Sequence, residues 1–222
     1  MPVRVAINGF GRIGRNVLRS SMHRLDVEFV HINDLTSADM LAYLLQHDTV
    51  HGRFGEPVSF VDGALHIGDS RISVSSERNP ANLPWAEHEV DVVLECTGVF
   101  LSGEAARAHL DAGASKVVIS APAKGVDATV VYGVNNQAIG SGASIVSNAS
   151  CTTNCLAPVA KVLNDSVGIE VGMMTTVHSY TMDQNLLDAP HRKGKFRRAR
   201  AAAQNMVPTT TGAAVAVSKV LP

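Results

Sequence analysis

Cysteine is scarce in this chain of 222 residues, with only three, at Cys96, Cys151 and Cys155. Three irregularly spaced cysteines cannot build the disulfide framework that holds small secreted domains together. The sequence therefore favours free thiols in a reducing compartment, and we expect a cytoplasmic protein.

Long apolar runs and an excess of charge are also missing. No run approaches the roughly 18 apolar residues of a membrane span, and the N-terminus has no apolar region of a signal peptide. Lys and Arg number 19 against 20 Asp and Glu, a formal net charge of -1. This balance gives no reason to expect a membrane or a nucleic acid as partner. The 45% hydrophobic content can bury a sizeable core in one large or two small domains.

Two spacings of apolar residues alternate along the first two thirds of the chain. Short apolar runs typical of buried strands are followed by stretches with helical spacing. Such alternation favours an α/β fold, with a parallel sheet covered on both faces. Strands are predicted at 3–8, 27–32, 90–96, 116–120 and 144–147, helices at 12–23, 37–46 and 103–112, and short antiparallel strands in loops across 50–84.

The composition changes near Asn148. After this position we predict a helix over 150–163 and a strand over 172–178. Neither a repeat nor a low-complexity linker marks the boundary. The sequence predicts one domain at 1–148 and a second at 149–222.

A glycine-rich turn joins the first predicted strand to the first predicted helix. Its residues, Gly9-Phe10-Gly11-Arg12-Ile13-Gly14, fit the pattern G-x-G-x-x-G. The first glycine permits a tight turn, the second lets the backbone approach a pyrophosphate, and the third lets helix pack on strand. The alternative is a glycine turn used only for packing. Strand, turn and helix together favour a Rossmann doubly wound parallel sheet that binds a dinucleotide.

Asp34 follows the second predicted strand, 20 residues after Gly14. A carboxylate there can accept hydrogen bonds from an adenosine ribose and would repel a 2′-phosphate. The expected cofactor is therefore NAD in preference to NADP.

Cys151 lies at the start of the helix predicted after the boundary. Unpaired N–H groups and the helix dipole at such a position stabilise a thiolate. His178, 27 residues later, could serve as its base at the end of the next predicted strand. Taken alone, such a cysteine is more often a small buried hydrophobe and such a histidine a structural residue.

Cys155 lies one helical turn after Cys151. A metal pair is not favoured, because no further Cys and His at zinc-like spacing complete four ligands. A disulfide is not favoured either, because two positions one turn apart on a helix suit its geometry poorly. We expect Cys155 to serve in packing and no metal site.

The segment Ser150-Cys151-Thr152-Thr153-Asn154-Cys155-Leu156-Ala157-Pro158 resembles the active-site signature of glyceraldehyde-3-phosphate dehydrogenases. Residues 6–15, 45–52 and 205–214 are similar to the same family, so the resemblance covers the whole chain. It implies a phosphorylating, NAD-dependent oxidoreductase of glycolysis and gluconeogenesis. The resemblance also implies that 149–222 is the N-terminal part of an α+β catalytic domain.

By this resemblance, Cys151 attacks the aldehyde of D-glyceraldehyde 3-phosphate and His178 removes the proton. Hydride leaves for the nicotinamide, a thioester remains, and inorganic phosphate attacks it and releases 1,3-bisphosphoglycerate. The implied cofactor-binding residues are Gly9, Gly11, Arg12, Ile13, Gly14, Asp34, Arg78, Thr97, Gly98 and Ser120. The implied substrate- and phosphate-binding residues are Ser150, Thr152, Thr181, Arg198, Thr211 and Gly212.

A basic run at 191–200 would suggest nucleic acid if read alone. In the family this loop folds between subunits beside the cofactor, which implies a homotetramer and no nucleic-acid partner. The Asp188-Ala189-Pro190 stretch departs from the Leu-Pro common in strictly NAD-dependent bacterial members, a difference that bears on cofactor preference.

Members of the family are longer, and the sequence resembles them without their C-terminal third. The absent part supplies a second substrate-site arginine, an asparagine beside the nicotinamide and most of the catalytic sheet. We expect a fragment, and a chain that ended here would have unpaired strand edges and low stability. The alternatives are an erythrose-4-phosphate dehydrogenase, an NAD-binding protein without turnover, and a cysteine hydrolase, against which the glycine-rich turn and Asp34 argue.

Overall fold

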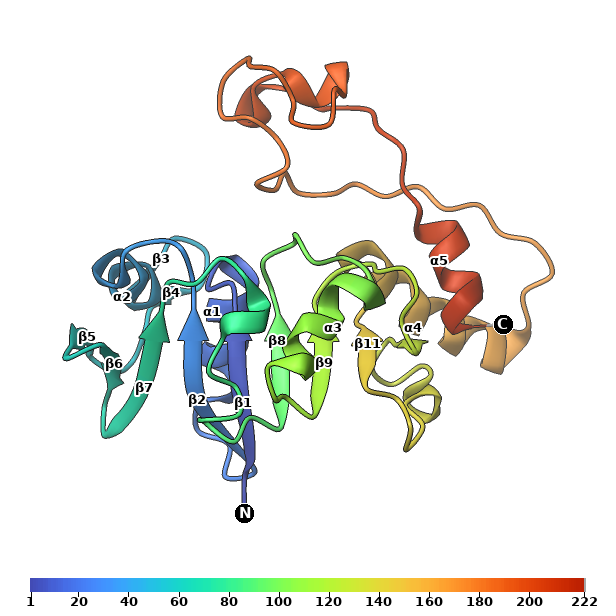
Figure 1. Cartoon of the computed structure of the whole chain (residues 1–222). Coiled ribbons are helices and arrows are strands. Elements are labelled where there is room, and N and C mark those ends of the chain that lie inside the picture. The colour runs from blue at the N-terminus through green and yellow to red at the C-terminus, as the bar shows by residue number, and fades with distance from the viewer. Residues whose placement is uncertain (222) are drawn as a thin grey trace.

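The computed structural model describes residues 1–221 and divides visibly into a body and a long excursion (Figure 1). The body is a sheet with helices packed on it. Residues 170–212 leave the body, arc over it and return to α5 (Ala213–Val220), which packs on α4 (Cys151–Val167) through Val220 and Ala157. In the described part of the chain, no helix is long and apolar enough to cross a membrane.

The body contains a 9-stranded sheet in the order β10-β11-β9-β8-β1-β2-β7-β6-β5, and a separate pair, β3-β4. The pairing is parallel from β10 to β7 and antiparallel along the β7-β6-β5 edge. The strands are β1 (Val3–Asn8), β2 (Val27–Asn33), β3 (His47–Asp48), β4 (Gly52–Arg53), β5 (Val58–Val61), β6 (Ala64–Ile67), β7 (Ser70–Ser75), β8 (Val92–Glu95), β9 (Lys116–Ile119), β10 (Ala128–Thr129) and β11 (Ile145–Ser147).

Helices follow the strands of the parallel part. Besides α4 and α5, they are α1 (Arg12–Ser21), α2 (Ala38–Gln46) and α3 (Gly103–Asp111). Short 3-10 helices lie at η1 (Pro80–Asn82), η2 (Asn136–Ala138), η3 (Phe196–Ala199) and η4 (Ala202–Gln204).

Both faces of the central strand are buried, which is the arrangement that covered parallel sheets require. On one face Ile7 belongs to a core with Leu18 of α1 and Leu45 of α2. On the opposite face Ala6 packs in a second core with Trp85. Successive residues of β1 therefore serve different cores, and the predicted doubly wound sheet is confirmed.

The strands in the region 50–84 have a different place in the fold from the predicted one. The strands expected only in loops across 50–84 extend the main sheet, because β7 pairs in parallel with β2 and β6 and β5 follow it. The predicted helix over 150–163 exists and continues to Val167.

The strand predicted over 172–178 is wrong. These residues have no regular secondary structure, and all but Met174 among them are exposed. A strand needs a neighbour to take up its N–H and C=O groups. No strand lies beside these residues in the region described, so their apolar pattern cannot form a ladder.

Candidate active site

A cleft of about 330 Å³ opens where β1, β2 and β8 end. Parallel strands bind ligands at this carboxyl edge, where their connections diverge. Twelve residues line it: Asn8, Gly9, Gly11, Asn33, Asp34, Leu35, Glu77, Arg78, Cys96, Thr97, Val99 and Phe100.

The three glycines of the turn have three different surroundings. Gly9 has φ +92°, and a Cβ there would stand 2.6 Å from the Thr97 nitrogen. A Cβ on Gly14 would stand 2.4 Å from the Gly9 carbonyl oxygen. Around Gly11, by contrast, nothing lies within 4 Å. Two glycines therefore let backbones approach within the protein, and the third leaves open space in the cleft wall.

Asp34 is held at the cleft by two backbone donors. Its Oδ2 accepts a hydrogen bond from the Phe10 nitrogen at 2.7 Å, and its Oδ1 accepts one from the Thr36 nitrogen at 2.9 Å. A carboxylate can accept about four hydrogen bonds. The side chain is only half-buried, so it keeps acceptor capacity for a hydroxyl of a ligand.

The structure brings together half of the residues implied to bind the cofactor. Gly9, Gly11, Asp34, Arg78 and Thr97 line the cleft. The remaining members lie outside its lining: Arg12, Ile13, Gly14, Gly98 and Ser120.

Arg12 and Ile13 begin α1 and have separate surroundings. The Arg12 guanidinium forms an ion pair with Asp48 of β3. Ile13 is 49% exposed. Gly98 lies between the cleft residues Thr97 and Val99 and has φ +70°, a backbone conformation that favours glycine.

Cys151 and His178 meet outside this cleft. Cys151 is the first residue of α4, and its Sγ lies 3.2 Å from His178 Nε2. On the other side of the ring, Nδ1 donates a hydrogen bond to the Ser179 carbonyl oxygen at 2.7 Å. That bond places the ring hydrogen on Nδ1, and Nε2 is left to exchange a proton with the thiol.

The two groups shift each other's pKa in opposite directions. Partial burial would raise the pKa of Cys151, but the hydrogen bond and charge of His178, with hydrogen bonds from Thr152, lower it below its usual value. The Ser179 carbonyl and then Cys151 raise the pKa of His178. Both shifts favour a thiolate beside an imidazolium, the state in which a cysteine is nucleophilic.

Ser150 caps the helix that carries the thiol. Its Oγ accepts a hydrogen bond from the Thr153 nitrogen at 3.0 Å and lies 2.7 Å from Thr153 Oγ1. An N-cap of this kind satisfies one of the free donors of the first turn. Thr152, the residue directly after Cys151, hydrogen-bonds to the Cys151 thiol.

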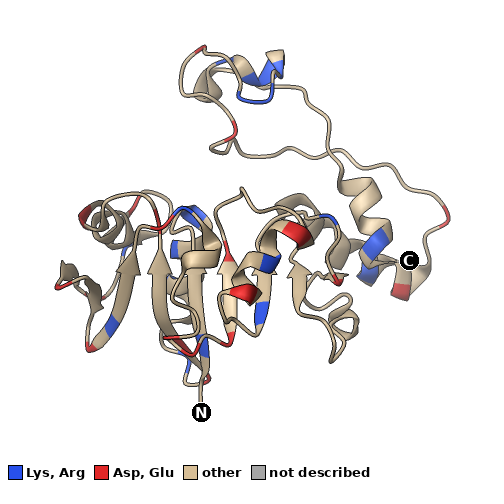
Figure 2. Ribbon diagram, viewed as in Figure 1, with Lys and Arg blue, Asp and Glu red and all other residues tan. Residues whose placement is uncertain are grey.

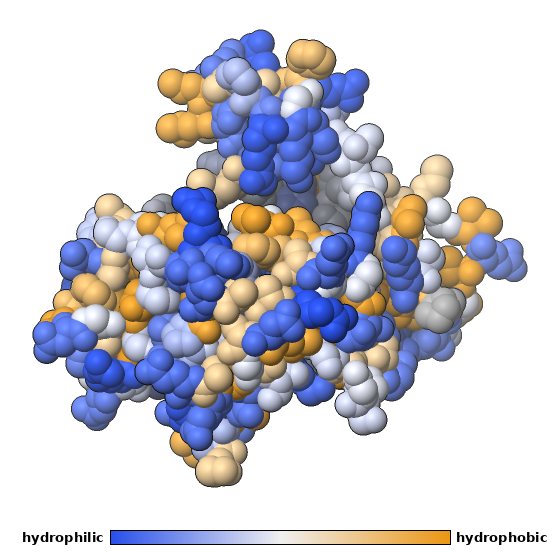
Figure 3. Space-filling model, in the orientation of Figure 1, coloured by the Kyte–Doolittle hydropathy of each residue, from blue (hydrophilic) through white to orange (hydrophobic). Residues whose placement is uncertain are grey.

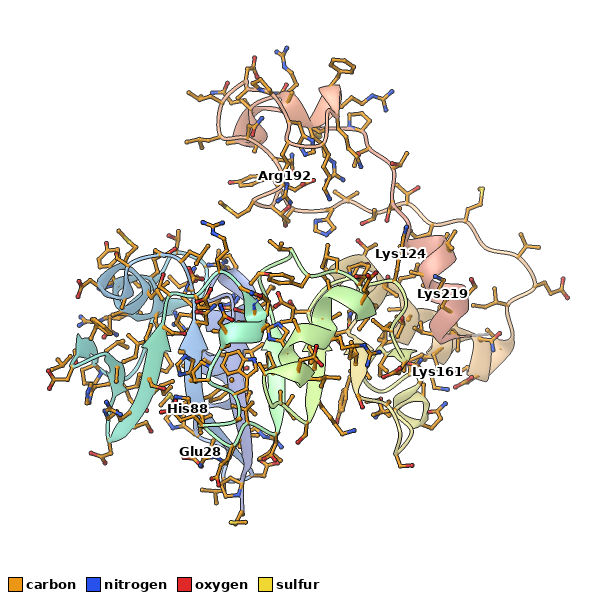
Figure 4. All side chains as sticks on the ribbon, viewed as in Figure 1. Glu28, His88, Lys124, Lys161, Arg192 and Lys219 are labelled. Carbon is orange, nitrogen blue, oxygen red and sulfur yellow. The ribbon has the colours of Figure 1, made fainter. Side chains whose placement is uncertain are left out.

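The other implied phosphate-binding residues lie on the excursion. Arg198 forms an ion pair with Asp183, and its Nε donates a hydrogen bond to Thr209 Oγ1 at 3.2 Å. Asp183 also lies 3.3 Å from Arg192, so one carboxylate holds two arginines of the basic run. Figure 2 shows Lys and Arg of this run gathered on the excursion, and Figure 4 shows Arg192 among them.

Thr181, Thr211 and Gly212 have local structural roles. The Oγ1 atoms of Thr181 and Thr211 accept hydrogen bonds from the nitrogens of Asp183 and Ala213, at 3.4 and 3.2 Å. Gly212 is the N-cap of α5. Apolar side chains are exposed nearby, with Phe196 92% accessible, and Figure 3 shows hydrophobic atoms at the surface of this segment.

The packing role predicted for Cys155 is wrong. Cys155 is exposed, because the buried side of α4 runs through Thr153 and Ala157, on either side of it in sequence. Cys96 is the least exposed of the three thiols, and its partial burial raises its pKa to about 11. Among residues 1–221, no group of three or more potential metal ligands occurs.

Sequence reasoning missed several cleft residues. Asn8 and Asn33 line the cleft, as do Glu77, Val99 and Phe100, and none of them was assigned a role from the sequence. A signal for the first two was available, since each is an asparagine that ends a strand after buried, mostly apolar residues. Polar residues at the carboxyl ends of adjacent parallel strands lie together.

Two family models match two separate parts of the chain. The model "Glyceraldehyde 3-phosphate dehydrogenase, NAD binding domain" matches residues 3–103, which hold the cleft. The model "Glyceraldehyde 3-phosphate dehydrogenase, C-terminal domain" matches residues 150–222, which hold Cys151 and His178. The chain belongs to the glyceraldehyde-3-phosphate dehydrogenase family.

Curated bacterial glyceraldehyde-3-phosphate dehydrogenases are similar along this whole chain. The enzyme of Kitasatospora aureofaciens is 61% identical over 221 residues, 99% of this chain. Glyceraldehyde-3-phosphate dehydrogenase 1 of Bacillus subtilis (strain 168) is 56% identical over 223 residues, and the Clostridium pasteurianum protein 55% over 219. The chain spans 66% of the length of each of these relatives.

Proposed function

We propose that this chain carries out the oxidative phosphorylation of D-glyceraldehyde 3-phosphate to 1,3-bisphosphoglycerate with NAD. The observation that supports it best is the 3.2 Å contact between Cys151 Sγ and His178 Nε2 at the N-terminus of α4. In a member of this family, that pair is a nucleophile beside its base. We further propose that residues 1–148 form the NAD-binding domain and 149–222 part of the catalytic domain.

The cleft residues fit a dinucleotide. Gly11 leaves room for a pyrophosphate against the backbone that begins α1. Asp34 would accept hydrogen bonds from the adenosine ribose, and Arg78 and Thr97 line the same cleft. The other assigned contacts, Arg12, Ile13, Gly14, Gly98 and Ser120, stay proposals. When bound, NAD supplies the acceptor for the hydride that leaves the substrate.

The chemical steps on the protein follow from the Cys151–His178 pair. The Cys151 thiolate adds to the aldehyde carbon, and the resulting alkoxide takes the proton of the His178 imidazolium, which gives a thiohemiacetal and leaves His178 neutral. His178 Nε2 then removes the hydroxyl proton as the hydride leaves, which converts the carbon into a thioester. Inorganic phosphate attacks the thioester carbonyl, and Cys151 departs as a thiolate that His178 stabilises.

Two phosphate groups need donors near the thiol. Ser150 and Thr152 flank Cys151 in sequence, and their hydroxyls suit phosphate oxygens once Ser150 shares its capping role. Arg198 would add a guanidinium after leaving Asp183, and Thr181, Thr211 and Gly212 would add hydroxyl and amide donors. We propose that these groups hold the substrate phosphate and inorganic phosphate, and that chains assemble as a homotetramer.

The test is a kinetic assay with two cysteine variants. Protein, NAD and phosphate are mixed with glyceraldehyde 3-phosphate or erythrose 4-phosphate, and the absorbance of reduced nicotinamide is followed. We expect phosphate-dependent reduction with the triose phosphate, lost in Cys151→Ser and retained in Cys155→Ser. NAD binding without reduction in the unchanged protein would contradict the proposed activity, and faster reduction with the tetrose would contradict the proposed substrate.

A further inference from the structure

Three buried polar side chains end three neighbouring strands beneath the cleft. They are Asn8 of β1, Asn33 of β2 and Glu95 of β8, with 2%, 3% and 1% exposure. The strand register places Asn8 opposite both of the others. Asn33 Nδ2 donates to Asn8 Oδ1 at 2.8 Å, and Asn8 Nδ2 donates to Glu95 Oε2 at 2.6 Å. The proposed chemistry uses none of these bonds.

The direction of this chain of hydrogen bonds is fixed at one end by a backbone donor. The Glu77 nitrogen lies 2.8 Å from Asn33 Oδ1, and a backbone N–H can only donate. The atom it contacts must therefore be the amide oxygen of Asn33. The amide nitrogen of Asn33 then faces Asn8, and that of Asn8 faces Glu95, so the carboxylate receives a hydrogen bond.

An indole fixes the direction at the other end. Trp85 Nε1 lies 3.0 Å from His109 Nδ1, and an indole nitrogen can only donate. His109 thus accepts on Nδ1 and carries its hydrogen on Nε2, which lies 3.0 Å from Glu95 Oε2. Since Trp85 and His109 are fully buried, no water replaces this partner of the carboxylate.

The second oxygen of Glu95 holds the wall of the cleft. Glu95 Oε1 accepts a hydrogen bond from the Thr97 nitrogen at 2.8 Å and another from the Thr97 hydroxyl. Thr97 lines the cleft, as do Asn8 and the glycine whose missing Cβ lets Thr97 approach. One buried carboxylate thus ties the end of β1 to the turn after β8.

We propose that Glu95 is a positioning residue for the nucleotide cleft. Its charged carboxylate accepts the four hydrogen bonds described above and thereby holds Thr97 against Gly9. The inference rests on the proposed function, because it concerns the dinucleotide that the cleft would hold. An uncharged amide cannot replace the carboxylate, since its NH2 group would face donors on one side. Thr97 or Asn8 would then lose its partner, and a buried donor left unpaired loses about 1–3 kcal/mol.

The experiment compares Glu95→Gln with Glu28→Gln, a matched loss of charge on β2. Glu28 pairs with Arg4 at the sheet end away from the excursion (Figure 4). Amide exchange of Thr97 and the single indole resonance, from Trp85, are read by NMR without ligand, and NAD is then titrated. We expect Glu95→Gln to speed Thr97 exchange about tenfold, to shift the indole resonance and to raise the NAD dissociation constant about tenfold. Glu28→Gln should change none of these.

Unchanged Thr97 exchange together with unchanged NAD affinity in a folded Glu95→Gln protein overturns the proposal. Failure of the unchanged protein to bind NAD overturns the proposed function instead, and Thr97 exchange still decides the positioning role. If Glu95→Gln does not fold, a second pair gives the answer: His109→Gln keeps a donor toward Glu95 and His109→Leu removes it. Equal Thr97 exchange in these two variants, at equal helix content by circular dichroism, also overturns the proposal.

Discussion

The backbone nitrogen of Thr97 lies 2.6 Å from the point at which a Cβ on Gly9 would stand, so the segments that follow β1 and β8 approach as closely as a glycine allows. Gly9→Ala must also place an alanine at φ +92°. We expect a loss of about 3 kcal/mol in the free energy of unfolding, from overpacking and backbone strain together. Urea denaturation measures it.

Gly11→Ala is the matched control for that loss. Its Cβ meets nothing within 4 Å, so the expected change in unfolding free energy is below about 1 kcal/mol. The same Cβ would occupy the space offered to a pyrophosphate, and NAD affinity should fall. A Gly11→Ala protein that binds NAD normally would contradict the assignment of this turn.

Asp34→Asn should change the choice between NAD and NADP. The amide keeps the shape of the side chain but can no longer accept from both the Phe10 and Thr36 nitrogens with its two terminal atoms. It also removes the charge that repels a 2′-phosphate. We expect NAD affinity to fall about tenfold and NADP affinity to rise, both measured by calorimetry. Asp39→Asn, in the first turn of α2, is the control, and an unchanged ratio of the two affinities would refute this role.

The alkylation rate of Cys151 should reveal its lowered pKa. Because the thiol ionises below its usual pH, iodoacetamide should modify Cys151 at a pH where Cys155, exposed on the same helix, reacts slowly. His178→Asn should move the Cys151 profile to higher pH. Peptide mass spectrometry separates the two sites. Identical pH profiles of Cys151 alkylation in the unchanged protein and in His178→Asn would contradict this explanation.

The same pKa shifts set the direction in which the stability contributed by Cys151 and His178 changes with pH. For Cys151, whose pKa is lower in the folded chain, stabilisation is present above the unfolded pKa of about 8.5 and is lost as pH falls through the folded value. For His178, whose pKa is raised, it is present below about 6.5 and lost as pH rises through the folded value. Both shifts therefore act in the same direction, toward a thiolate beside an imidazolium.

His31 should make the fold sensitive to acid. Burial, and then the charge of His88 whose ring lies 4.7 Å away, lowers the pKa of His31 to about 4. The folded chain binds fewer protons than the unfolded chain below about pH 6.5, so stability decreases from there toward pH 4. The expected loss is about 3 kcal/mol.

His31→Gln tests this source of the acid sensitivity. It should be less stable at pH 7, because His31 bridges Ser73 and Ser75 at 2.7 and 2.8 Å, yet its stability should change less between pH 6.5 and 4. Urea midpoints at a series of pH values measure both effects. His47→Gln, at an exposed position, should keep the original slope; a His31→Gln protein with that slope would contradict the assignment.

Asp183→Asn should loosen the basic part of the excursion. One carboxylate pairs with Arg198 and Arg192, and the loss of its charge leaves both arginines without this partner. We expect faster cleavage by trypsin between residues 191 and 200, followed by mass spectrometry. Asp165→Asn removes an exposed helical pair with Lys161, worth only about 0.3–0.5 kcal/mol, and should leave the cleavage rate unchanged.

Local patterns predicted much of the fold. The glycine-rich turn, the β1-α1-β2 unit and the helix after Ser150 all follow from residues close in sequence, and the structure places them within a few residues of the predicted ends. The closeness of Cys151 and His178 was also predicted, although that prediction placed His178 at the end of a strand that the structure does not contain.

Features that depend on distant partners could not be predicted. The strand expected over 172–178 failed because its apolar pattern says nothing about a neighbouring strand. Glu95 escaped notice because two of its partners, at positions 8 and 109, lie 87 and 14 residues away in the sequence. Only the register of β1 with β8 brings the first of them to it.

The buried row of Asn8, Asn33 and Glu95 limits how this sequence can change over generations. Asn8 and Glu95 are separated by 87 positions, yet replacing either alone leaves a buried polar group without its partner, whereas replacing a whole set with apolar groups can be nearly neutral. Variation at these positions should therefore be correlated, with the three residues lost together or kept together.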